Sequence, residues 1–204
     1  MFFGIADYAS FVVAVIVFLM IPGPGNLALI TSTGKGGVRA GVACTFGLIA
    51  GDQVLMWLAV AGVAALLAAH PAWFKAVQYL GAAYLAWIGL KLLFSPVGSA
   101  SPVRIEPRQY ARQAFLITLL NPKAIVFYMA FFPLFLDPTQ HRGMVTFVAM
   151  ALTIAAITAV YCLTLCAFAQ AISAQVRAHR RLAAALQRLA GLFLVGFGIK
   201  LGTQ

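Results

Sequence analysis

The chain has 204 residues, of which 63% are hydrophobic and only 9% are charged, whereas about one-quarter of the residues in soluble domains are charged. This composition excludes a soluble globular protein, and the presence of only 3 cysteines excludes a disulfide scaffold, so an integral membrane protein remains. The formal net charge of +10 arises because acids are scarce and because Lys and Arg flank the apolar runs, so we expect no nucleic-acid partner.

Six apolar stretches are long enough to cross a bilayer, since about 20 helical residues span a hydrocarbon core about 30 Å thick. In chain order they cover residues 3–31, 42–69, 74–94, 114–136, 144–172 and 182–201. The first stretch runs into Ile-Pro-Gly-Pro-Gly and not into a small-residue cleavage site, so we expect it to remain in the mature protein. The sequence therefore predicts an all-α integral membrane protein with six transmembrane helices.

The basic residues predict the orientation of these spans. Most of the 14 Lys and Arg flank the first, third and fifth connections, whereas Lys75, Arg142 and Lys200 lie on the opposite side. Because cytoplasmic loops carry the excess of positive charge, we expect both termini on the non-cytoplasmic side.

Two motifs of the first half recur in the second half. Gly-x-Lys-Leu ends the third and the sixth stretch, and the Pro-rich segment at residues 22–25 is matched by Asn-Pro-Lys at residues 121–123. Each half has three spans, an odd number, so the second half inserts upside down relative to the first, as in many secondary transporters. We expect a single membrane domain with a first three-helix repeat over residues 1–95, a cytoplasmic connecting loop over residues 96–112 and an inverted repeat over residues 113–204.

The first Pro-rich segment predicts a broken helix. Pro22 and Pro24 lack a backbone donor, and Gly23 and Gly25 remove side-chain restraint, so the helix should unwind within the membrane. Its exposed backbone groups then need a protected cavity. The helix that restarts at Asn26 would offer free N–H groups and a positive dipole end to a carboxylate. A kink that serves packing alone is the alternative.

The second Pro-containing segment predicts the partner of the first. Lys123 follows Pro122 directly, so it would supply positive charge to a carboxylate, or else extend to the membrane interface. Asn121 and Asn26 would cap the restarted helices by accepting from free N–H groups. Capping alone would also explain both asparagines.

Asp52 is the only acid within a predicted span. An ionisable group at that depth costs about 2.5–3.5 kcal/mol on insertion scales, so we expect it to be used. Its candidate roles are proton carrier and partner of a substrate ammonium group. A structural ion pair with Lys123 is the alternative, and the two roles are compatible.

The glycines, cysteines and histidines give weaker indications of function. Glycines at positions 37, 41, 47 and 51 form a small-residue stripe that favours close helix packing, within the chain or in a homodimer. Cys162 and Cys166 are spaced i, i+4 and leave open a membrane thiol relay, although buried cysteine is usually a small apolar residue. The three histidines have no Cys or carboxylate at ligand spacing, so we expect neither a metal nor a cofactor.

Five motifs follow one another along the chain: Ile-Pro-Gly-Pro-Gly-Asn at residues 21–26, Gly34-x-x-x-x-Arg39-x-Gly41, Gly51-Asp52, Tyr79-Leu-Gly81-x-x-Tyr84-Leu-x-x-x-Gly89 and Leu120-Asn-Pro-Lys123. Together they resemble the lysine-exporter (LysE/RhtB) family of amino-acid efflux proteins over essentially the whole chain.

The resemblance implies a transporter and not an enzyme, which exports amino acids across a bacterial inner membrane at the expense of the proton motive force. A dibasic substrate would require a second carboxylate for its side chain, and the predicted spans contain only Asp52. Small neutral amino acids such as threonine, homoserine or leucine are therefore favoured as substrates. Some members of the wider superfamily are thiol-electron carriers with cysteines beside both Pro-broken regions. Neither region has a cysteine here, which argues against a relay.

Overall fold

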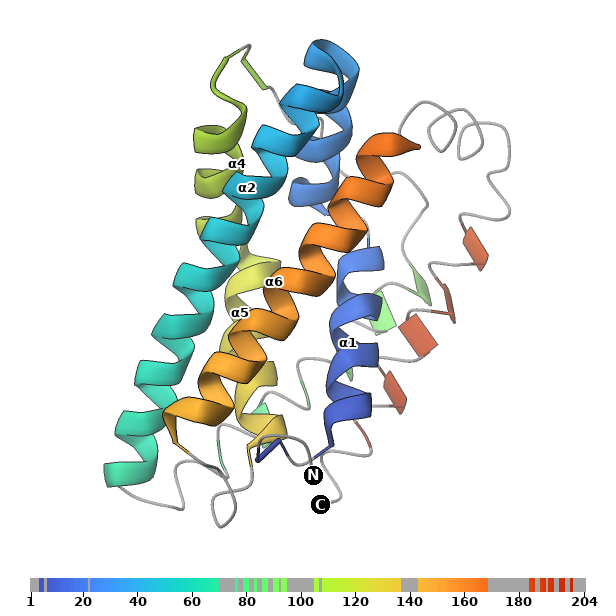
Figure 1. Cartoon of the computed structure of the whole chain (residues 1–204). Coiled ribbons are helices and arrows are strands. Elements are labelled where there is room, and N and C mark those ends of the chain that lie inside the picture. Colours follow the sequence, from blue (N-terminus) through green and yellow to red (C-terminus); the bar gives the residue numbers. More distant parts are fainter. Residues whose placement is uncertain are drawn as a thin grey trace.

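The computed structural model of the protein describes residues 4, 5, 7–21, 23–69, 105, 106, 108–136 and 143–168, together with scattered positions between 76 and 94 and between 184 and 199. Its elements are the helices α1 (Tyr8–Met20), α2 (Pro24–Ala69), α4 (Tyr110–Leu119), α5 (Pro122–Phe131) and α6 (Met144–Ala167), and the short 3-10 helix η1 (Phe132–Phe135) (Figure 1). The prediction of a helical protein is confirmed over these elements. The predicted third and sixth spans lie outside the described residues, apart from the scattered positions.

The long helix α2 is a helical hairpin. Gly37 has φ 70° and ψ −168°, a left-handed backbone that favours glycine. Leu48 packs against Gly25, and Thr33 packs against Gly41, so the arm before Gly37 runs antiparallel to the arm after it. Figure 1 shows the two arms joined by a sharp turn at one end of the bundle.

This turn corrects one prediction. The sequence predicts a loop between spans at residues 3–31 and 42–69, but helix continues on both sides of Gly37. A single glycine suffices because it reaches a conformation that reverses the chain at once.

Two described stretches, Pro24–Gly62 and Met144–Ala167, are long and apolar enough to cross a membrane. A straight helix of 39 residues would be about 58 Å long at 1.5 Å per residue, almost twice the hydrocarbon core. The reversal at Gly37 explains this excess length, because the stretch does not run in one direction. Met144–Ala167 is α6, and it leaves large apolar side chains such as Leu152 and Val160 exposed, as lipid contact requires.

The second arm of α2 packs closely on α4. A methyl group at Gly47 would collide with the backbone of Ala111, and one at Gly51 would lie 2.7 Å from Cβ of Thr118. The two glycines therefore let the helices approach closely within the chain, as small residues do in membrane bundles.

We expect Gly47→Ala to destabilise the protein by about 1–3 kcal/mol, because the added methyl group forces α2 and α4 apart. The midpoint of thermal unfolding of the purified protein in detergent measures this. Gly62→Ala is the control, since a methyl group there meets nothing within 4 Å and an alanine should stabilise the helix by about 0.5–1 kcal/mol. Equal midpoints for the two variants would contradict the close approach.

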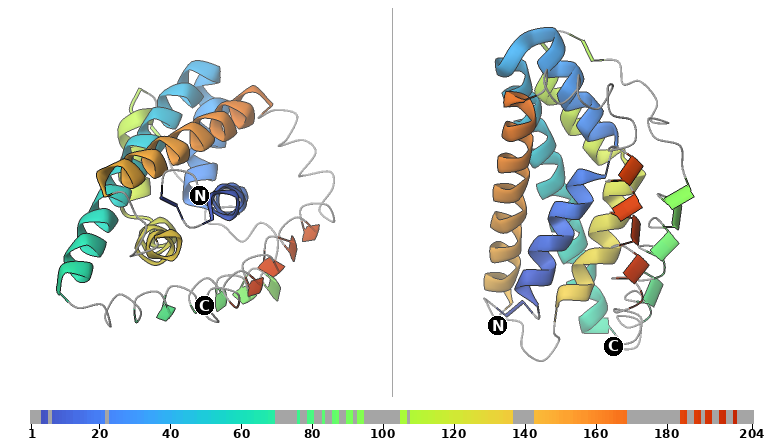
Figure 2. Two further views of the ribbon diagram at one scale, coloured as in Figure 1. Left: turned by 60° about the horizontal axis from the view of Figure 1, so that its bottom comes forward. Right: turned by 90° about the vertical axis from the view of Figure 1, so that its right-hand side faces the viewer.

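Helices α1, α5 and α6 share an aromatic core. The rings of Phe18 and Phe127 stack with centroids 3.6 Å apart, and those of Phe11 and Phe135 meet edge to face at 5.3 Å. Figure 2 shows α1 and α5 nearly end-on in its left view, with α6 beside them. This core fixes the end of α1 relative to the start of α5.

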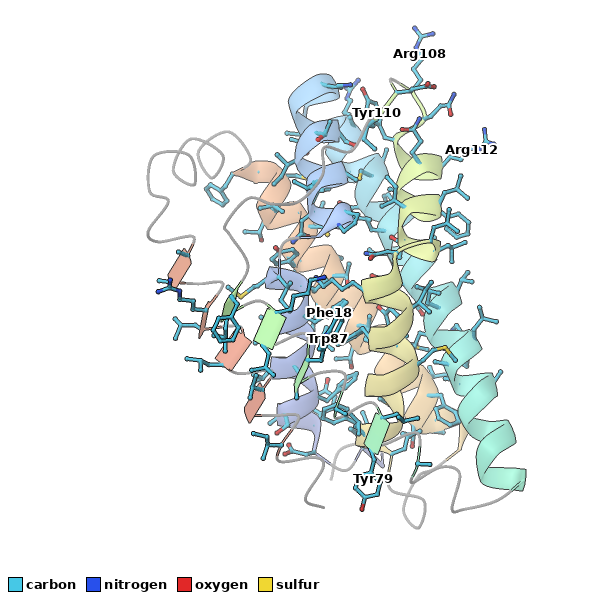
Figure 3. The ribbon with its side chains drawn as sticks, turned by 180° about the vertical axis from the view of Figure 1, so that it is seen from behind. Phe18, Tyr79, Trp87, Arg108, Tyr110 and Arg112 are labelled. Atoms are coloured by element: carbon cyan, nitrogen blue, oxygen red, sulfur yellow. The ribbon has the colours of Figure 1, made fainter. Side chains whose placement is uncertain are left out.

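Basic residues gather at one end of the bundle. Figure 3 shows Arg108 and Arg112 at the end where α2 turns, and Tyr79 at the opposite end. Lys35 and Arg39 are exposed on either side of the turn at Gly37. The helix α1 starts at the other end (Figure 1).

Candidate functional site

Helix α1 ends where α2 begins, in the middle of the bundle. Ile21 is extended, with φ −66° and ψ 119°, and its N–H donates to the carbonyls of Val17 and Phe18. Gly23 then leads into α2, and its carbonyl accepts from Leu27 at 3.1 Å. The two helices are thus separated by residues 21–23, of which Pro22 lies outside the described residues. Backbone carbonyls at the end of α1 are left without helical donors.

A second junction, between α4 and α5, lies next to the first. Asn121 Oδ1 accepts from the backbone N–H of Lys123 at 3.1 Å, so Asn121 caps α5 at its first turn. Asn26 behaves differently from the prediction that it caps its own helix. Its Nδ2 donates across the first junction to the carbonyl of Leu19 at 2.9 Å.

Lys123 joins the two junctions. Its Nζ donates to the carbonyl of Ile21 at 2.8 Å and to that of Phe18 at 3.2 Å, and it lies 4.4 Å from the centroid of the Phe18 ring. A cation is favoured at this point because the C-terminal end of a helix carries partial negative charge. Lys123 therefore extends inward to α1, and not to a membrane interface.

Asp52 faces the same region from the second arm of α2. It is buried, with 8% of its surface exposed, and it forms a hydrogen bond with Tyr128 on α5. Lys123 lies close enough to interact with the carboxylate electrostatically. No ion pair within 4.0 Å joins these two described side chains, so the direct structural pair is not formed in this conformation.

One cavity, with a volume of about 60 Å³, connects these residues. Six of the predicted site residues line it: Gly23, Gly25, Asn26, Asp52, Asn121 and Lys123. Pro24 and Pro122 begin α2 and α5, whose first turns border the cavity. The space holds only a few water molecules, so this conformation is a closed one for any larger solute.

The sequence does not single out several residues of the cavity wall. Thr118, Thr158, Leu48 and Phe18 also line it. Their residue types do not mark them in the sequence, because threonine and apolar residues recur throughout the spans. A threonine of the cavity wall can be recognised by a buried hydroxyl that makes no hydrogen bond within its helix, and only a structure shows this.

The three cysteines Cys44, Cys162 and Cys166 are free and buried. Cys162 lines the cavity, and Cys166 lies 3.5 Å from the Thr33 hydroxyl. Within the described part of the chain, no group of three or more His, Cys, Asp or Glu side chains is arranged so that it could hold a metal ion. Of the three cysteines, only Cys162 lines this cavity.

Comparison with known proteins identifies relatives of similar length. Residues 16–204 match the family described as LysE type translocator. The chain is 34% identical over 205 residues to a leucine efflux protein of Klebsiella pneumoniae, with 98% of this chain and 97% of the relative covered. It is 33% identical over 205 residues to a leucine efflux protein of Salmonella typhimurium, with the same coverage. An uncharacterised membrane protein of Pseudomonas aeruginosa is 35% identical over 208 residues, which cover 98% of this chain and 96% of the relative. No solved structure matches.

Proposed function

The chain belongs to the LysE type translocator family of membrane transporters, and from this premise we propose that it exports small neutral amino acids, such as leucine, threonine or homoserine, driven by the proton motive force. The observation that carries the proposal is the cavity, which is lined by the carboxylate of Asp52, the ammonium group of Lys123 and the starts of two helices. A zwitterionic amino acid carries the complementary pair of charges.

The substrate carboxylate is received at the junctions. The first turn of α2 contributes the backbone N–H groups of Gly25 and Asn26, and the first turn of α5 contributes that of Ala124. Such groups and the positive dipole end of a helix attract anions. Lys123 adds a full positive charge next to them.

The substrate ammonium group and the coupling proton both bind to the carboxylate of Asp52. Of the acids that the structure describes, only Asp52 is buried, whereas Asp7 and Glu106 are exposed. Ionisable residues inside a membrane commonly carry protons or pair with ligands. Inward movement of a proton through Asp52 would release the amino group and drive outward movement of the substrate.

The closed cavity requires an opening step. Its wall combines α1 and α2 from the first half of the chain with α4, α5 and α6 from the second half. We propose that the halves are two inverted three-helix repeats whose first helices are interrupted at the Pro-containing segments. Rocking of one repeat against the other would expose the cavity to each side of the membrane in turn.

The distribution of charge supports one orientation in the bacterial inner membrane. The exposed Lys35, Arg39, Arg108 and Arg112 share the end at which α2 turns. We propose that this end faces the cytoplasm and that, with six membrane spans, both termini lie on the opposite side.

The thiol relay is not favoured. Relatives at 33–34% identity over 98% of the chain are named leucine efflux proteins. Among the described residues of the two junctions there is no cysteine, and the three cysteines of the chain are not paired.

Efflux of leucine from dipeptide-loaded cells tests the proposal. We expect cells that express the protein to release leucine faster than cells that carry an empty plasmid, and we expect a protonophore to abolish the difference. A protonophore removes the proton gradient without occupying the cavity. Efflux that is equally fast with and without the protonophore would contradict proton coupling, and efflux equal to that of the empty-plasmid cells for leucine, threonine and homoserine would contradict export.

A further inference from the structure

Thr158 lines the cavity, and its hydroxyl is buried and makes no hydrogen bond with the described residues. It lies in the interior of α6, and 1% of its surface is exposed. Its Oγ1 has no hydrogen-bond partner among the described residues. Because an unpaired hydroxyl is unfavourable in an apolar interior, its position at the cavity points to a partner that enters there.

Other threonines of the chain show that this is not the usual arrangement. The hydroxyls of Thr33, Thr45 and Thr153 each donate to the backbone carbonyl four residues earlier, at 2.7–2.9 Å. Threonine in a helix interior commonly satisfies its hydroxyl in this way. The Thr158 hydroxyl makes no such bond, so it is left available to a solute in the cavity.

The position of Thr158 along α6 places it near Asp52. The second arm of α2 and α6 run antiparallel, because Gly41 packs against Cys166 and Gln53 Nε2 donates to the carbonyl of Ala151 at 3.1 Å. Thr158 falls between these two contacts, at about the level of Leu48, which precedes Asp52 by one helical turn, and all three residues line the same cavity. The carboxylate of Asp52 and the hydroxyl of Thr158 therefore offer two acceptors to one solute.

We propose that Thr158 Oγ1 binds the substrate by accepting a hydrogen bond from its amino group, beside Asp52. The inference rests on the proposed function, since it assigns a further contact to the exported amino acid. An ammonium group has three N–H donors, and a single carboxylate on one wall does not satisfy all of them. Lys123, by contrast, uses its own donors on the carbonyls of Phe18 and Ile21 and offers no acceptor.

The test uses Thr158→Val, which keeps the shape of the side chain and removes the hydroxyl. With the purified full chain in detergent and L-leucine as the probe, we expect the affinity measured by calorimetry to fall about tenfold, which corresponds to about 1.4 kcal/mol. The thermal midpoint without leucine should not fall, since the hydroxyl has no partner to lose. Thr158→Ser should restore the affinity to within about threefold of the parent, because it restores the acceptor.

Thr45→Val is the matched control. Thr45 is also buried, at 3% exposure, but its hydroxyl bonds to Gly41 and it does not line the cavity. We expect this variant to bind L-leucine as the parent does. The analogue 4-methylpentanoate, which lacks the amino group, should bind the parent and Thr158→Val with equal affinity.

The outcomes separate the inference from the proposed function. If the parent binds L-leucine and Thr158→Val binds it equally well, the inference is overturned and the exporter remains. An equal loss for L-leucine and for 4-methylpentanoate would also overturn it, because the hydroxyl would then contact another part of the ligand. If the parent binds neither leucine, threonine nor homoserine, the proposed function fails with it.

Discussion

Asp52→Asn is expected to reduce protonophore-sensitive leucine efflux to background, a fall of at least about 100-fold. The variant keeps the shape of the side chain but removes both the proton site and the negative charge that faces the substrate ammonium. Its stability should stay equal to that of the parent or rise slightly, because a buried charge is costly to hold in a membrane. Efflux is measured in dipeptide-loaded cells after the amount of protein in the membrane has been matched.

Asp7→Asn is the control for this change. Asp7 caps α1 by accepting from the Ser10 N–H at 3.0 Å, and it is exposed. Asparagine is an equally good N-cap, so this variant should export leucine at the parental rate. If Asp52→Asn exports as fast as Asp7→Asn, the assignment of proton coupling to Asp52 is wrong.

Lys123→Met is expected to abolish efflux and also to destabilise the protein by about 1–3 kcal/mol. The carbonyls of Phe18 and Ile21 lose their charged donor and keep only the bonds from the Ile21 N–H at 3.3 Å and from Asn26 Nδ2 at 3.4 Å. The cavity also loses the positive charge beside the starts of α2 and α5. Methionine fills a similar volume, so the loss measures the ammonium group more than the packing. Thermal unfolding and efflux are both recorded.

Lys35→Met provides the comparison. Lys35 also donates to a backbone carbonyl, that of Ile105 at 2.9 Å, but it lies at the exposed end of the bundle. We expect this variant to lose little stability and no efflux. Combining Asp52→Asn with Lys123→Met should restore part of the stability lost by Lys123→Met alone, because no buried carboxylate is then left without its nearby cation. Parental efflux by Lys123→Met would contradict its role at the carboxylate.

The features that the sequence could predict are those with a visible cost in a membrane. A proline, an acid or a lysine within an apolar run stands out by composition alone, and Asp52 and Lys123 are residues of this kind. The structure places both at one cavity with Gly23, Gly25 and Asn121, although their roles in binding stay predictions.

The contacts that join distant segments could not be predicted in the same way. Lys123 donates to a carbonyl of α1, which is distant from it in sequence. Asn26 donates to the carbonyl of Leu19, although an asparagine at the start of a helix is expected to cap that helix. Both outcomes depend on which carbonyls the end of α1 leaves free once the helices have packed. Thr158 cannot be predicted for a related reason, since threonine is common in these spans and only the missing hydrogen bond of its hydroxyl distinguishes it.

The bond between Lys123 and α1 also bears on the order in which the protein is made. The ribosome releases Phe18 well before Lys123, which follows it by 105 residues, so α1 enters the membrane long before its partner exists. Until α5 arrives, the carbonyls of Phe18 and Ile21 have only the longer bonds from the Ile21 N–H at 3.3 Å and from Asn26 Nδ2 at 3.4 Å. Backbone groups in hydrocarbon must be fully satisfied within the protein, so the hydrogen bonding at the end of α1 is complete only once the second half of the chain has been inserted.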